Sequence, residues 1–375
     1  MQLRTFKTSN GCKAYFAIDT LINNTCCGGV RIKEGLSAEE IKALAHEMTL
    51  KLGFWRLVPF GGAKFGISVP NSMDFKERAA LISEFTACLN DSLGNVCYFP
   101  GTDFGSSFED LNIIKRALIF NSLKGAVRNM CYYKSMRGFA RGALSFFKKS
   151  STDTAYYAAL TCVESLKRYS AYCGIKPRTA IILGFGKVGK NIAILLESFG
   201  IKIVGVSTEE GAIYDKKGLP ANQLLKYASE YGHSFVKKYS AKTFQREDII
   251  SFDADAIMPC ADIWMINEKN VKEISAKLVI SGANLPATLK AEKWMIRNGI
   301  SYLPSFLCNC GGVVATFMEK KYGSKAGSEM LKAYNQRFNE VLSMAEQKKR
   351  NIMAAADIAS DWFEKYKTSI EKQAL

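Results

Sequence analysis

The sequence predicts an α/β protein of two domains, the second built on a doubly wound parallel sheet, and three observations support this fold class. The chain has 375 residues, more than one domain usually holds, and 48% of them are apolar, enough for two cores. The stretch TAIILGFGKVGKNIAILLESFGIKIVGVS gives a strand, a glycine turn, an amphipathic helix and a second strand, which make one βαβ unit. Further strand segments, DADAIMP, AKLVISGAN and SYLPSFL, alternate with helical stretches, as in a parallel sheet.

The first domain opens with short strands and an amphipathic helix. KAYFAIDT and CCGGVRI are predicted strands with turn residues between them. Ser37 and Glu40 predict a capping box at the start of the helix, whose apolar stripe includes Ile41 and Leu44. Lys51 lies beside this stripe, at a position where a lysine usually extends its charged end to water.

A glycine-rich segment and a second helix follow. VPFGGAKFGI is expected to form a loop, in which Gly61 and Gly62 let the backbone approach a ligand and a tight turn presents Lys64. FKERAALISEFTACL has a helical pattern, and a polar turn leads on to YFPGTDFGSS. From the change of pattern alone we place one domain at 1–149, a second at 150–319, and a helical segment that packs back on them at 320–375.

Composition excludes several classes of protein. No stretch has the roughly 18 to 20 apolar residues of a membrane helix, and the start MQLRTFKTSNGCK lacks the apolar middle of a signal peptide, so we expect a cytoplasmic protein. Eleven cysteines is an odd number and indicates reduced thiols. The cysteine pairs 26/27 and 308/310 lack CxxC spacing, and the chain has only two histidines, so no metal site is expected.

The net charge of +16 raises the alternative of a nucleic-acid binder. Much of the excess lies between Lys124 and Lys149, where seven basic residues and no acidic one are interleaved with aromatic side chains. Such a run can form a nucleic-acid groove, but it equally describes a helix with a solvated basic face. Because no recognisable RNA or DNA module accompanies the run, we favour the second interpretation and expect no nucleic-acid partner.

The glycine motif of the second domain predicts a dinucleotide site. Gly184, Gly186 and Gly189 form GFGKVG between a strand and a helix, together with Lys187 and Val188. Glycine at these places permits the turn, the approach of a pyrophosphate and tight helix packing, and the helix N-terminus offers free N–H donors. In this context the motif predicts a Rossmann-like dinucleotide-binding domain.

The end of the second strand leaves the choice between NAD and NADP open. The acidic residue expected about 20 positions after the glycines, which would bind the ribose of NAD, is not plainly present, because the strand ends in Ser207 and Thr208. Glu209 and Glu210 follow and would disfavour a 2′-phosphate, whereas the two hydroxyl groups and the positive charge of the chain would tolerate one. We therefore expect NAD as cofactor, with NADP as the alternative.

From about residue 9 to residue 319 the chain resembles the glutamate, leucine, phenylalanine and valine dehydrogenases. The blocks that match in order are GGVR (28–31), MTLK (48–51), PFGGAK (59–64), GTD (101–103), TDTA (152–155), GFGKVG (184–189), VSTEEGAIYD (206–215), SGANLP (281–286) and NCGGV (309–313). Their joint order is far more specific than any single block. The resemblance implies a homo-oligomeric enzyme that interconverts an L-amino acid with its 2-oxo acid and ammonia, with the first domain serving substrate binding and oligomerisation.

The resemblance also implies roles for individual residues. Lys51 would hold the substrate α-carboxylate, Lys64 would be the general base that activates water, and Asp103 would move protons to and from the amino nitrogen. Lysine ordinarily titrates at about 10.4, so burial and a neighbouring cation must lower the pKa of Lys64. The other matched residues are Gly28 and Gly29 on the substrate side, and Thr154, Asn284 and Asn309 at the nicotinamide end.

Four positions match the family's pocket for the substrate side chain: Cys27, Gly101, Val313 and Thr316. In glutamate enzymes a lysine stands at the position of Cys27 and pairs with the distal carboxylate, which is costly to bury without a cation. Gly101 leaves space for a bulky side chain. These residues predict a large apolar amino acid as substrate, with glutamate as the alternative. A protein of the same fold that binds NAD(P) for regulation without turnover is a third hypothesis.

Two departures from the family pattern concern the lysines. Lys51 and Lys64 are thirteen positions apart, one more than in the family pattern. Phe65 stands where a small residue usually follows the lysine, and its bulk is expected to crowd the cleft. Both departures bear on the geometry of the lysine pair.

Overall fold

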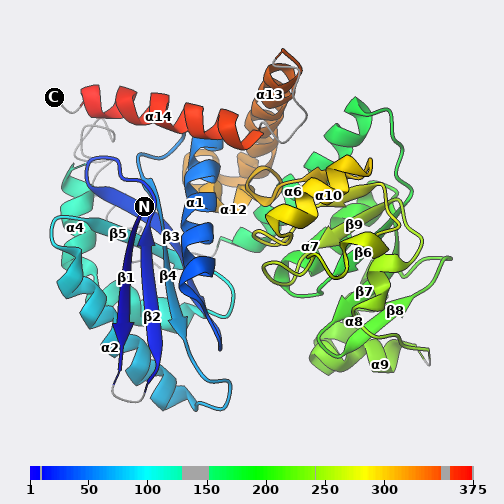
Figure 1. Ribbon diagram of the computed structural model, residues 1–375, viewed down its shortest axis with the longest axis horizontal. Coiled ribbons are helices and arrows are strands. Elements are labelled where there is room, and N and C mark those ends of the chain that lie inside the picture. The colour runs from blue at the N-terminus through cyan, green and yellow to red at the C-terminus, as the bar shows by residue number, and fades with distance from the viewer. Residues whose placement is uncertain (9–10, 129–151, 241, 348–354, 374–375) are drawn as a thin grey trace. The chain divides into compact units, whose positions relative to one another are not determined.

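The computed structural model describes residues 1–8, 11–128, 152–240, 242–347 and 355–373. By its internal contacts the chain divides into two units, one formed by Met1–Ser151 with Ala356–Leu375 and the other by Thr152–Ala355. The predicted domain boundary at residue 149 and most of the basic stretch 124–149 lie outside the described residues. Figure 1 shows the helices and strands in chain order.

The first unit is built on a five-stranded sheet. In spatial order its strands are β1 (Gln2–Lys7), β2 (Lys13–Ile18), β4 (Gly61–Ser68), β3 (Thr25–Ile32) and β5 (Cys97–Thr102). β1 pairs with β2 and β2 with β4 in antiparallel fashion, whereas β3 lies parallel to both β4 and β5. The predicted strands KAYFAIDT and CCGGVRI are confirmed as β2 and β3, while the prediction did not include β1 or β5.

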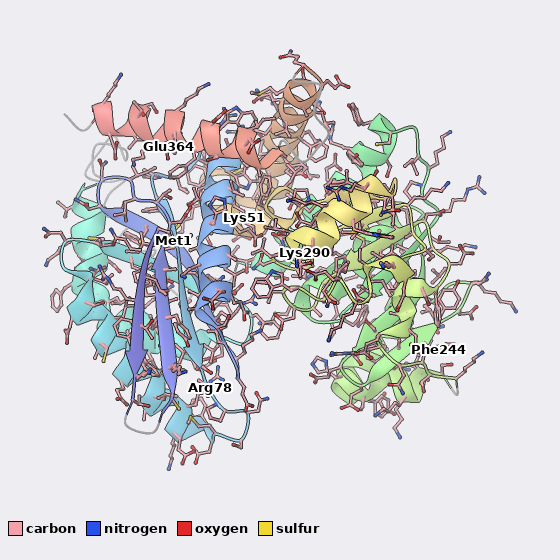
Figure 2. The ribbon with its side chains drawn as sticks, viewed as in Figure 1. Met1, Lys51, Arg78, Phe244, Lys290 and Glu364 are labelled. Atoms are coloured by element: carbon pink, nitrogen blue, oxygen red, sulfur yellow. The ribbon has the colours of Figure 1, made fainter. Side chains whose placement is uncertain are left out.

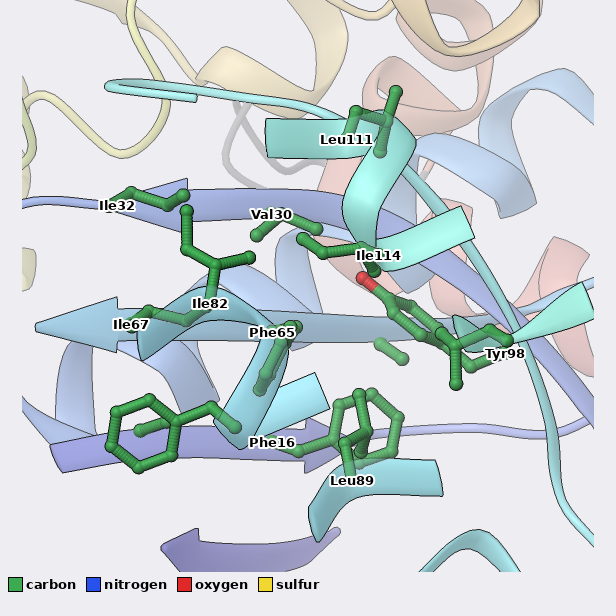
Figure 3. Packing of buried hydrophobic residues seen from close by; sticks show 14 of the residues in the cluster. Phe16, Val30, Ile32, Phe65, Ile67, Ile82, Leu89, Tyr98, Leu111 and Ile114 are labelled. Atoms are coloured by element: carbon green, nitrogen blue, oxygen red, sulfur yellow. The ribbon is translucent and has the colours of Figure 1, made fainter. Parts of the chain in front are cut away.

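The core of this unit lies between the sheet and two helices, α2 (Phe75–Leu93) and α3 (Phe108–Ala117). Figure 3 shows Ile82 and Leu89 of α2 packed over Phe16 and Phe65 of the strands. α4 (Ile119–Arg128) follows, and its Asn121 accepts a hydrogen bond from a backbone N–H of β5 at 2.9 Å. This contact occupies a donor on a strand that would otherwise be an open sheet edge.

α1 (Ala38–Trp55) packs on the face of β4 opposite this core, because successive side chains of a strand point to opposite faces. A Cβ at Gly62 would lie 2.3 Å from the hydroxyl oxygen of Thr49 on α1, so glycine allows this close contact. The predicted loop VPFGGAKFGI is therefore wrong over most of its length, and Lys64 extends from the middle of a strand. Phe65 points into the core and does not crowd Lys64.

The C-terminal helix α14 (Ala355–Gln373) returns to the first unit and packs on the end of α1. A Cβ at Gly53 would lie 2.1 Å from the carbonyl oxygen of Ala359, so the two helices meet backbone to backbone. The guanidinium of Arg56 lies 4.0 Å from the ring centroid of Trp362, a cation–π contact. The segment 320–375 is thus divided, because α13 (Ala326–Gln347) belongs to the second unit.

The second unit contains a six-stranded sheet. In spatial order its strands are β11 (Ser301–Leu303), β10 (Leu278–Ile280), β9 (Ala256–Pro259), β6 (Thr179–Leu183), β7 (Lys202–Thr208) and β8 (Gly211–Tyr214). Neighbouring strands are parallel except for β7 and β8. The strand order reverses between β6 and β9, and ligands of such sheets bind at the carboxyl ends of the strands at this point.

The helices of the second unit are α6 (Thr154–Tyr172), α7 (Lys187–Ser198), α8 (Ala221–Tyr231), α9 (Phe235–Tyr239), α10 (Leu289–Arg297), α11 (Ser305–Cys308), α12 (Gly311–Tyr322) and α13. The predicted strands DADAIMP, AKLVISGAN and SYLPSFL are confirmed as β9, β10 and β11, although shorter. The two-domain α/β fold with a doubly wound sheet is confirmed. Within the part of the chain that the structure describes, no helix is both long and apolar enough to cross a membrane.

Candidate active site

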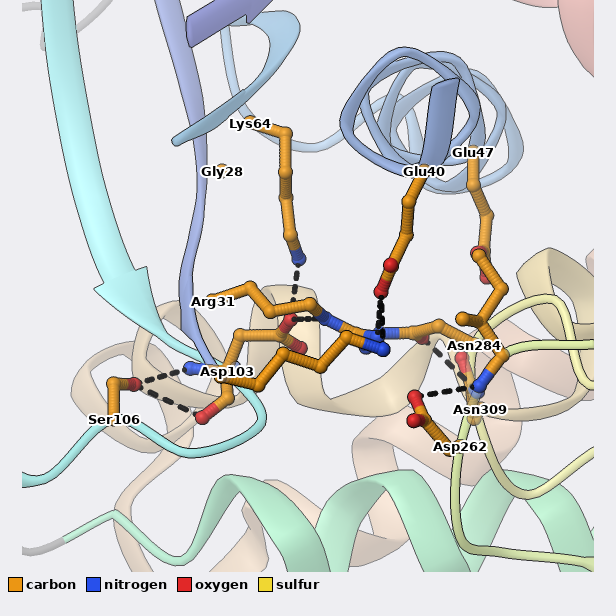
Figure 4. A network of polar contacts seen from close by, with 12 residues as sticks. Gly28, Arg31, Glu40, Glu47, Lys64, Asp103, Ser106, Asp262, Asn284 and Asn309 are labelled. Carbon is orange, nitrogen blue, oxygen red and sulfur yellow. Dashed lines mark hydrogen bonds and ion pairs between the residues drawn. The ribbon is translucent and has the colours of Figure 1, made fainter. Parts of the chain in front are cut away.

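Two cations share one carboxylate oxygen in the first unit (Figure 4). The Nζ of Lys64 lies 2.8 Å and the Nε of Arg31 lies 2.9 Å from Oδ2 of Asp103. The side chains of Lys64, Arg31 and Asp103 are 7%, 3% and 13% exposed, so solvent ions screen these pairs little. The structure thus brings together the two residues predicted to be catalytic, Lys64 and Asp103.

Glycine and a local turn allow the two side chains to meet. β3 lies between β4, which carries Lys64, and β5, which ends just before Asp103. A Cβ at Gly29 of β3 would lie 2.8 Å from the Cβ of Asp103 and 3.3 Å from the Nζ of Lys64. The hydroxyl of Ser106 accepts a hydrogen bond from the N–H of Asp103 and donates one to its carbonyl, both at 2.9 Å. Gly29 therefore makes the space, and Ser106 fixes the backbone.

Arg31 is a member of the site that the sequence prediction missed. Its guanidinium also binds Glu40, whose Oε1 lies 2.9 Å from Nη1 of Arg31 and 3.0 Å from Nζ of Lys33. The predicted capping box is consequently half wrong: Ser37 accepts from the N–H of Glu40, but the carboxylate of Glu40 turns to the cations. One feature of the sequence could have indicated this role. Arg31 ends the GGVR block of a predicted strand, and a buried guanidinium needs carboxylate partners.

Burial lowers the pKa of Lys64 from its ordinary value of 10.5, because an ammonium group is poorly solvated there. The carboxylate of Asp103 opposes this shift, while the charges of Arg31 and Lys51 add to it. Burial raises the pKa of Asp103, but Lys64 and Arg31 outweigh it and hold that pKa well below its ordinary value. The site thus combines an amine that gives up its proton readily with a carboxylate that stays ionised.

Lys51 is buried on α1 rather than extended to water, and Figure 2 marks its place on that helix. Its Nζ lies 3.1 Å from Oε1 of Glu47, one turn earlier on the same helix. Its charge contributes to lowering the pKa of Lys64. The charge of Lys51 therefore acts on Lys64 despite the additional residue between them.

The two predicted pocket positions of the first unit, Cys27 and Gly101, lie on the neighbouring strands β3 and β5. Burial raises the pKa of the Cys27 thiol to about 12, so this side chain is uncharged near neutrality. A Cβ at Gly101 would meet no described atom within 4 Å, which leaves open space there. Gly28 has a different role, because a Cβ would lie 1.7 Å from the carbonyl oxygen of Ala63, and glycine permits this close strand packing.

The glycine turn of the second unit follows β6 at the point where the strand order reverses. Gly184 has a φ of +102°, and at Gly189 a Cβ would lie 2.1 Å from the carbonyl oxygen of Gly184, so turn and helix close tightly. Gly186 precedes α7 without a side-chain cap, and a Cβ there would meet none of the described atoms within 4 Å. The N–H groups of Lys187 and Val188, in the first turn of α7, suit an anion.

The end of β7 carries Ser207 and Thr208, both buried. The hydroxyl of Thr208 donates to a backbone carbonyl oxygen at 2.8 Å. Glu210 forms an ion pair with Lys237 at 2.5 Å, whereas the side chain of Glu209 is 66% exposed. Glu209, whose Oε1 lies 3.8 Å from Nδ1 of His233, is the more exposed of the two acidic groups at this strand end.

Asn309 has a buried oxygen that lacks a hydrogen-bond partner among the described residues. Its Nδ2 donates to the carbonyl oxygen of Gly282 at 3.0 Å and to Oδ1 of Asn284 at 3.3 Å, which leaves its own Oδ1 unsatisfied. An acceptor in this state is costly unless a ligand supplies a donor. A nicotinamide carboxamide carries such a donor, so these residues fit a bound dinucleotide.

Thr154, Val313 and Thr316 lie on two helices that meet at their N-terminal ends. Thr154 is the first residue of α6, and Val313 and Thr316 are half-buried and one turn apart on α12. A Cβ at Gly312 would lie 2.9 Å from the carbonyl oxygen of Thr154, so the helices approach closely there. These three predicted residues belong to the second unit, whereas Lys51, Lys64, Asp103, Cys27 and Gly101 belong to the first.

Known proteins resemble the chain over 78% to 98% of its length. The NADP-specific glutamate dehydrogenase of Saccharolobus shibatae is 29% identical over 78% of this chain and 67% of its own length. The catabolic NAD-specific glutamate dehydrogenase of Bacillus subtilis is 29% identical over 78% of this chain and 66% of its own length. The hetero-hexameric glutamate dehydrogenase of Thermus thermophilus, solved in a Leu-bound form, covers 98% of this chain and 88% of its own at a TM-score of 0.76 and 20% identity.

Family models cover both units. The Glu/Leu/Phe/Val dehydrogenase dimerisation domain matches residues 3–119, and the Glutamate/Leucine/Phenylalanine/Valine dehydrogenase model matches residues 148–372. The resemblance inferred from the ordered motifs is thereby confirmed. The protein is a member of the glutamate/leucine/phenylalanine/valine dehydrogenase family.

Proposed function

We propose that the chain catalyses the NAD(P)-dependent oxidative deamination of an L-amino acid to its 2-oxo acid and ammonia, and the reverse reductive amination. The observation that carries this proposal is the buried cluster in which Lys64 and Arg31 share one oxygen of Asp103. An amine with a lowered pKa beside a carboxylate can accept and return protons, and a buried ammonium such as Lys51 can hold a carboxylate.

In the proposed mechanism Lys51 binds the α-carboxylate of the substrate. Lys64, in its neutral form, removes a proton from the water that attacks the imino acid. A neutral Lys64 no longer lowers the pKa of Asp103, which can then exchange protons with the amino nitrogen. Burial favours the neutral form of Lys64, and Arg31 adds to this effect. Arg31 is a positioning residue, because it acts through Asp103 and through the pKa of Lys64.

The glycine turn and the asparagines would hold the cofactor. The N–H groups at the start of α7 would bind its pyrophosphate, and Oδ1 of Asn309 would accept a hydrogen bond from its carboxamide, with Thr154 and Asn284 as further contacts. A bound nicotinamide supplies the acceptor and donor of hydride. The relatives include NADP-specific and NAD-specific enzymes, and the exposed Glu209 makes NAD the first cofactor to test.

Glutamate is the first substrate we propose, because the relatives are named glutamate dehydrogenases. They do not support the large apolar substrate predicted from the sequence. One observation still favours an uncharged side chain as a second candidate. The thiol of Cys27 stays neutral where glutamate enzymes carry a lysine, and the space at Gly101 is open.

A scan of L-amino acids with NAD and NADP at about pH 9.5 tests the reaction, with reduced-nicotinamide absorbance as the signal and Lys64→Ala as the control. A signal with glutamate supports the first candidate, and a signal with leucine or phenylalanine alone supports the second. If the dinucleotide binds but no amino acid gives a Lys64-dependent signal, the chain lacks turnover and the proposal is refuted.

Cys27→Lys separates the two substrates further. Supplying a cation at this position should raise kcat/KM for glutamate by at least about tenfold and lower it for leucine. Cys88→Lys, at an exposed cysteine of α2, serves as the matched control and should change neither value. An unchanged preference in folded Cys27→Lys would place the side-chain pocket elsewhere.

We also propose that the chain forms a homo-oligomer through its first unit, because the family model for residues 3–119 describes a dimerisation domain. Light scattering measures the mass in solution, and a monomer would contradict this proposal. A cytoplasmic location and the lack of a nucleic-acid partner stay predictions from the sequence.

A further inference from the structure

Lys51, which is assigned to the substrate carboxylate, already forms an ion pair with a carboxylate of the protein, that of Glu47. The two residues lie one turn apart on α1, with Glu47 nearer the N-terminus, the order that favours a helical ion pair. Oε1 of Glu47 lies 3.1 Å from Nζ of Lys51, and the side chains are 2% and 8% exposed. In Figure 4 Glu47 extends from α1 on the same side as Glu40, which binds Arg31.

The carboxylate of Glu47 has acceptor capacity to spare. Apart from its ion pair with Lys51, neither of its oxygens has a hydrogen-bond partner among the residues that the structure describes. A carboxylate offers about four acceptor positions, and buried polar atoms of native proteins are nearly always hydrogen-bonded. This buried anion is in contact with the cation assigned to the substrate, and it has acceptor positions left for a ligand that reaches Lys51.

The buried charges around Lys64 balance one another. While Lys64 is protonated, three cations with little exposure, Arg31, Lys51 and Lys64, accompany three carboxylates among the described residues, Glu40, Glu47 and Asp103. Lys33, the fourth cation, is 20% exposed and therefore partly screened by water. Without Glu47 the buried set would carry a net positive charge and would attract anions. With Glu47 it favours a ligand that brings both signs of charge.

We propose that Glu47 determines ligand specificity by competing with the substrate carboxylate for Lys51, so that the site prefers a zwitterionic amino acid over a 2-oxo acid. This inference rests on the proposed function, which assigns Lys51 to the substrate carboxylate. A 2-oxo acid brings only negative charge toward Glu47, and two carboxylates around one ammonium repel each other. An amino acid also brings an ammonium group, whose N–H groups can donate to the unsatisfied oxygens of Glu47.

Glu47→Gln tests this proposal, because it keeps the shape of the side chain and removes its charge. Isothermal titration calorimetry of the full chain would use two probe pairs, 2-oxoglutarate with glutamate and 4-methyl-2-oxopentanoate with leucine. The 2-oxo acid of the pair that binds should bind about tenfold more tightly to Glu47→Gln, and the amino acid should gain less than about threefold. Glu39→Gln, at an exposed position of the same helix, is the matched control and should change neither value.

The opposite result is equally definite. If folded Glu47→Gln binds the 2-oxo acid as wild type does, or more weakly, Glu47 only orients Lys51 and the proposal is overturned. If circular dichroism shows that Glu47→Gln does not fold, Glu47→Asp is the second variant, because it moves the charge away from Lys51 by the length of one methylene group. The Kd of the 2-oxo acid should then fall by a smaller factor. An unchanged Kd in folded Glu47→Asp also overturns the proposal.

Calorimetry measures binding, whereas the substrate scan measures turnover, so the two proposals can fail separately. An inactive chain in which Glu47→Gln still binds the 2-oxo acid more tightly would refute the proposed reaction and keep the competition. An active dehydrogenase whose Glu47→Gln variant shows no tightening would keep the reaction and refute the competition.

Discussion

The Asp103 cluster of the first unit and the glycine turn of the second are built by opposite means. In the cluster, buried charged side chains hold one another at 2.8 to 2.9 Å. In the turn, the geometry depends on glycines, which carry no side chain: Gly184 adopts a φ of +102°, and Gly189 approaches the backbone of Gly184. The difference predicts that the cluster is sensitive to the loss of a side chain, whereas the turn is sensitive to the gain of one.

Loss of Lys64 should have the largest effect. Lys64→Met retains most of the volume but no base, and kcat for deamination should fall by about 10²- to 10⁴-fold. Because burial lowers the pKa of Lys64, the wild-type rate should rise with pH and level off below pH 10.5. This rising limb of the pH–rate profile should be absent in the variant. The measurement is the rate of nicotinamide reduction against pH at saturating substrates.

Lys13→Met is the matched control for this change. Lys13 is exposed at the start of the neighbouring strand β2, so its loss should leave kcat unchanged. A wild-type kcat in Lys64→Met would show that Lys64 takes no part in the chemistry and that the cluster serves stability alone.

Loss of Arg31 should have the next largest effect, and on two observables. Arg31→Met removes one cation from both Asp103 and Glu40, so the free energy of unfolding should fall by about 3 to 5 kcal/mol. Because Arg31 also lowers the pKa of Lys64, the pH–rate limb should move to higher pH. A purely structural role for Arg31 would leave that limb in place.

The pH dependence of stability in acid tests separately whether Arg31 stabilises the fold through the ionised carboxylate of Asp103. Lys64 and Arg31 hold the pKa of Asp103 below 3.8, so its contribution to stability is present above that pH and is lost as the pH falls further. Without Arg31 this contribution is smaller, and the stability gap between wild type and Arg31→Met should narrow below pH 3.8 in denaturant titrations. Arg246→Met, which breaks an exposed ion pair, should change stability by less than about 0.5 kcal/mol.

The two regions also differ in how far the sequence predicts them. The glycine turn was predictable because its evidence is local: a strand, three glycines and a helix follow one another within one segment. The partners of the cluster come from distant segments, and Arg31 and Asp103 are 72 positions apart. Sheet register brings them together, and the sequence pattern gives no register between β3 and β5.

Two errors have the same physical origin. Gly61 and Gly62 suggested a loop, yet they lie in β4, because glycine serves a strand under a closely packed helix as well as it serves a turn. Glu40 fitted a capping box, yet its carboxylate binds Arg31. In both cases a tertiary contact decided between two local structures that the same residues permit.

Gain of a side chain at Gly189 should have a moderate effect on stability. In Gly189→Ala the new Cβ would lie 2.1 Å from the carbonyl oxygen of Gly184, and a backbone atom cannot rotate away as a side chain can. The turn or α7 must shift, at a cost of about 1 to 3 kcal/mol in the free energy of unfolding without cofactor. Urea titration measures this cost, and a variant as stable as wild type would show that the turn tolerates the gain.

Gly186→Ala should have the smallest effect on stability and should act on the cofactor instead. Gly186 has a φ of −79°, which any residue adopts, and a Cβ there meets no atom of the described residues within 4 Å. Unfolding without cofactor should therefore change by at most about 1 kcal/mol, the cost of alanine as a poorer N-cap. The Kd for NAD in calorimetry should still rise at least about tenfold, because the methyl group would occupy the space by which the pyrophosphate approaches the first turn of α7. If NAD bound Gly186→Ala as it binds wild type, that space would not receive the phosphates, and the turn would be structural only.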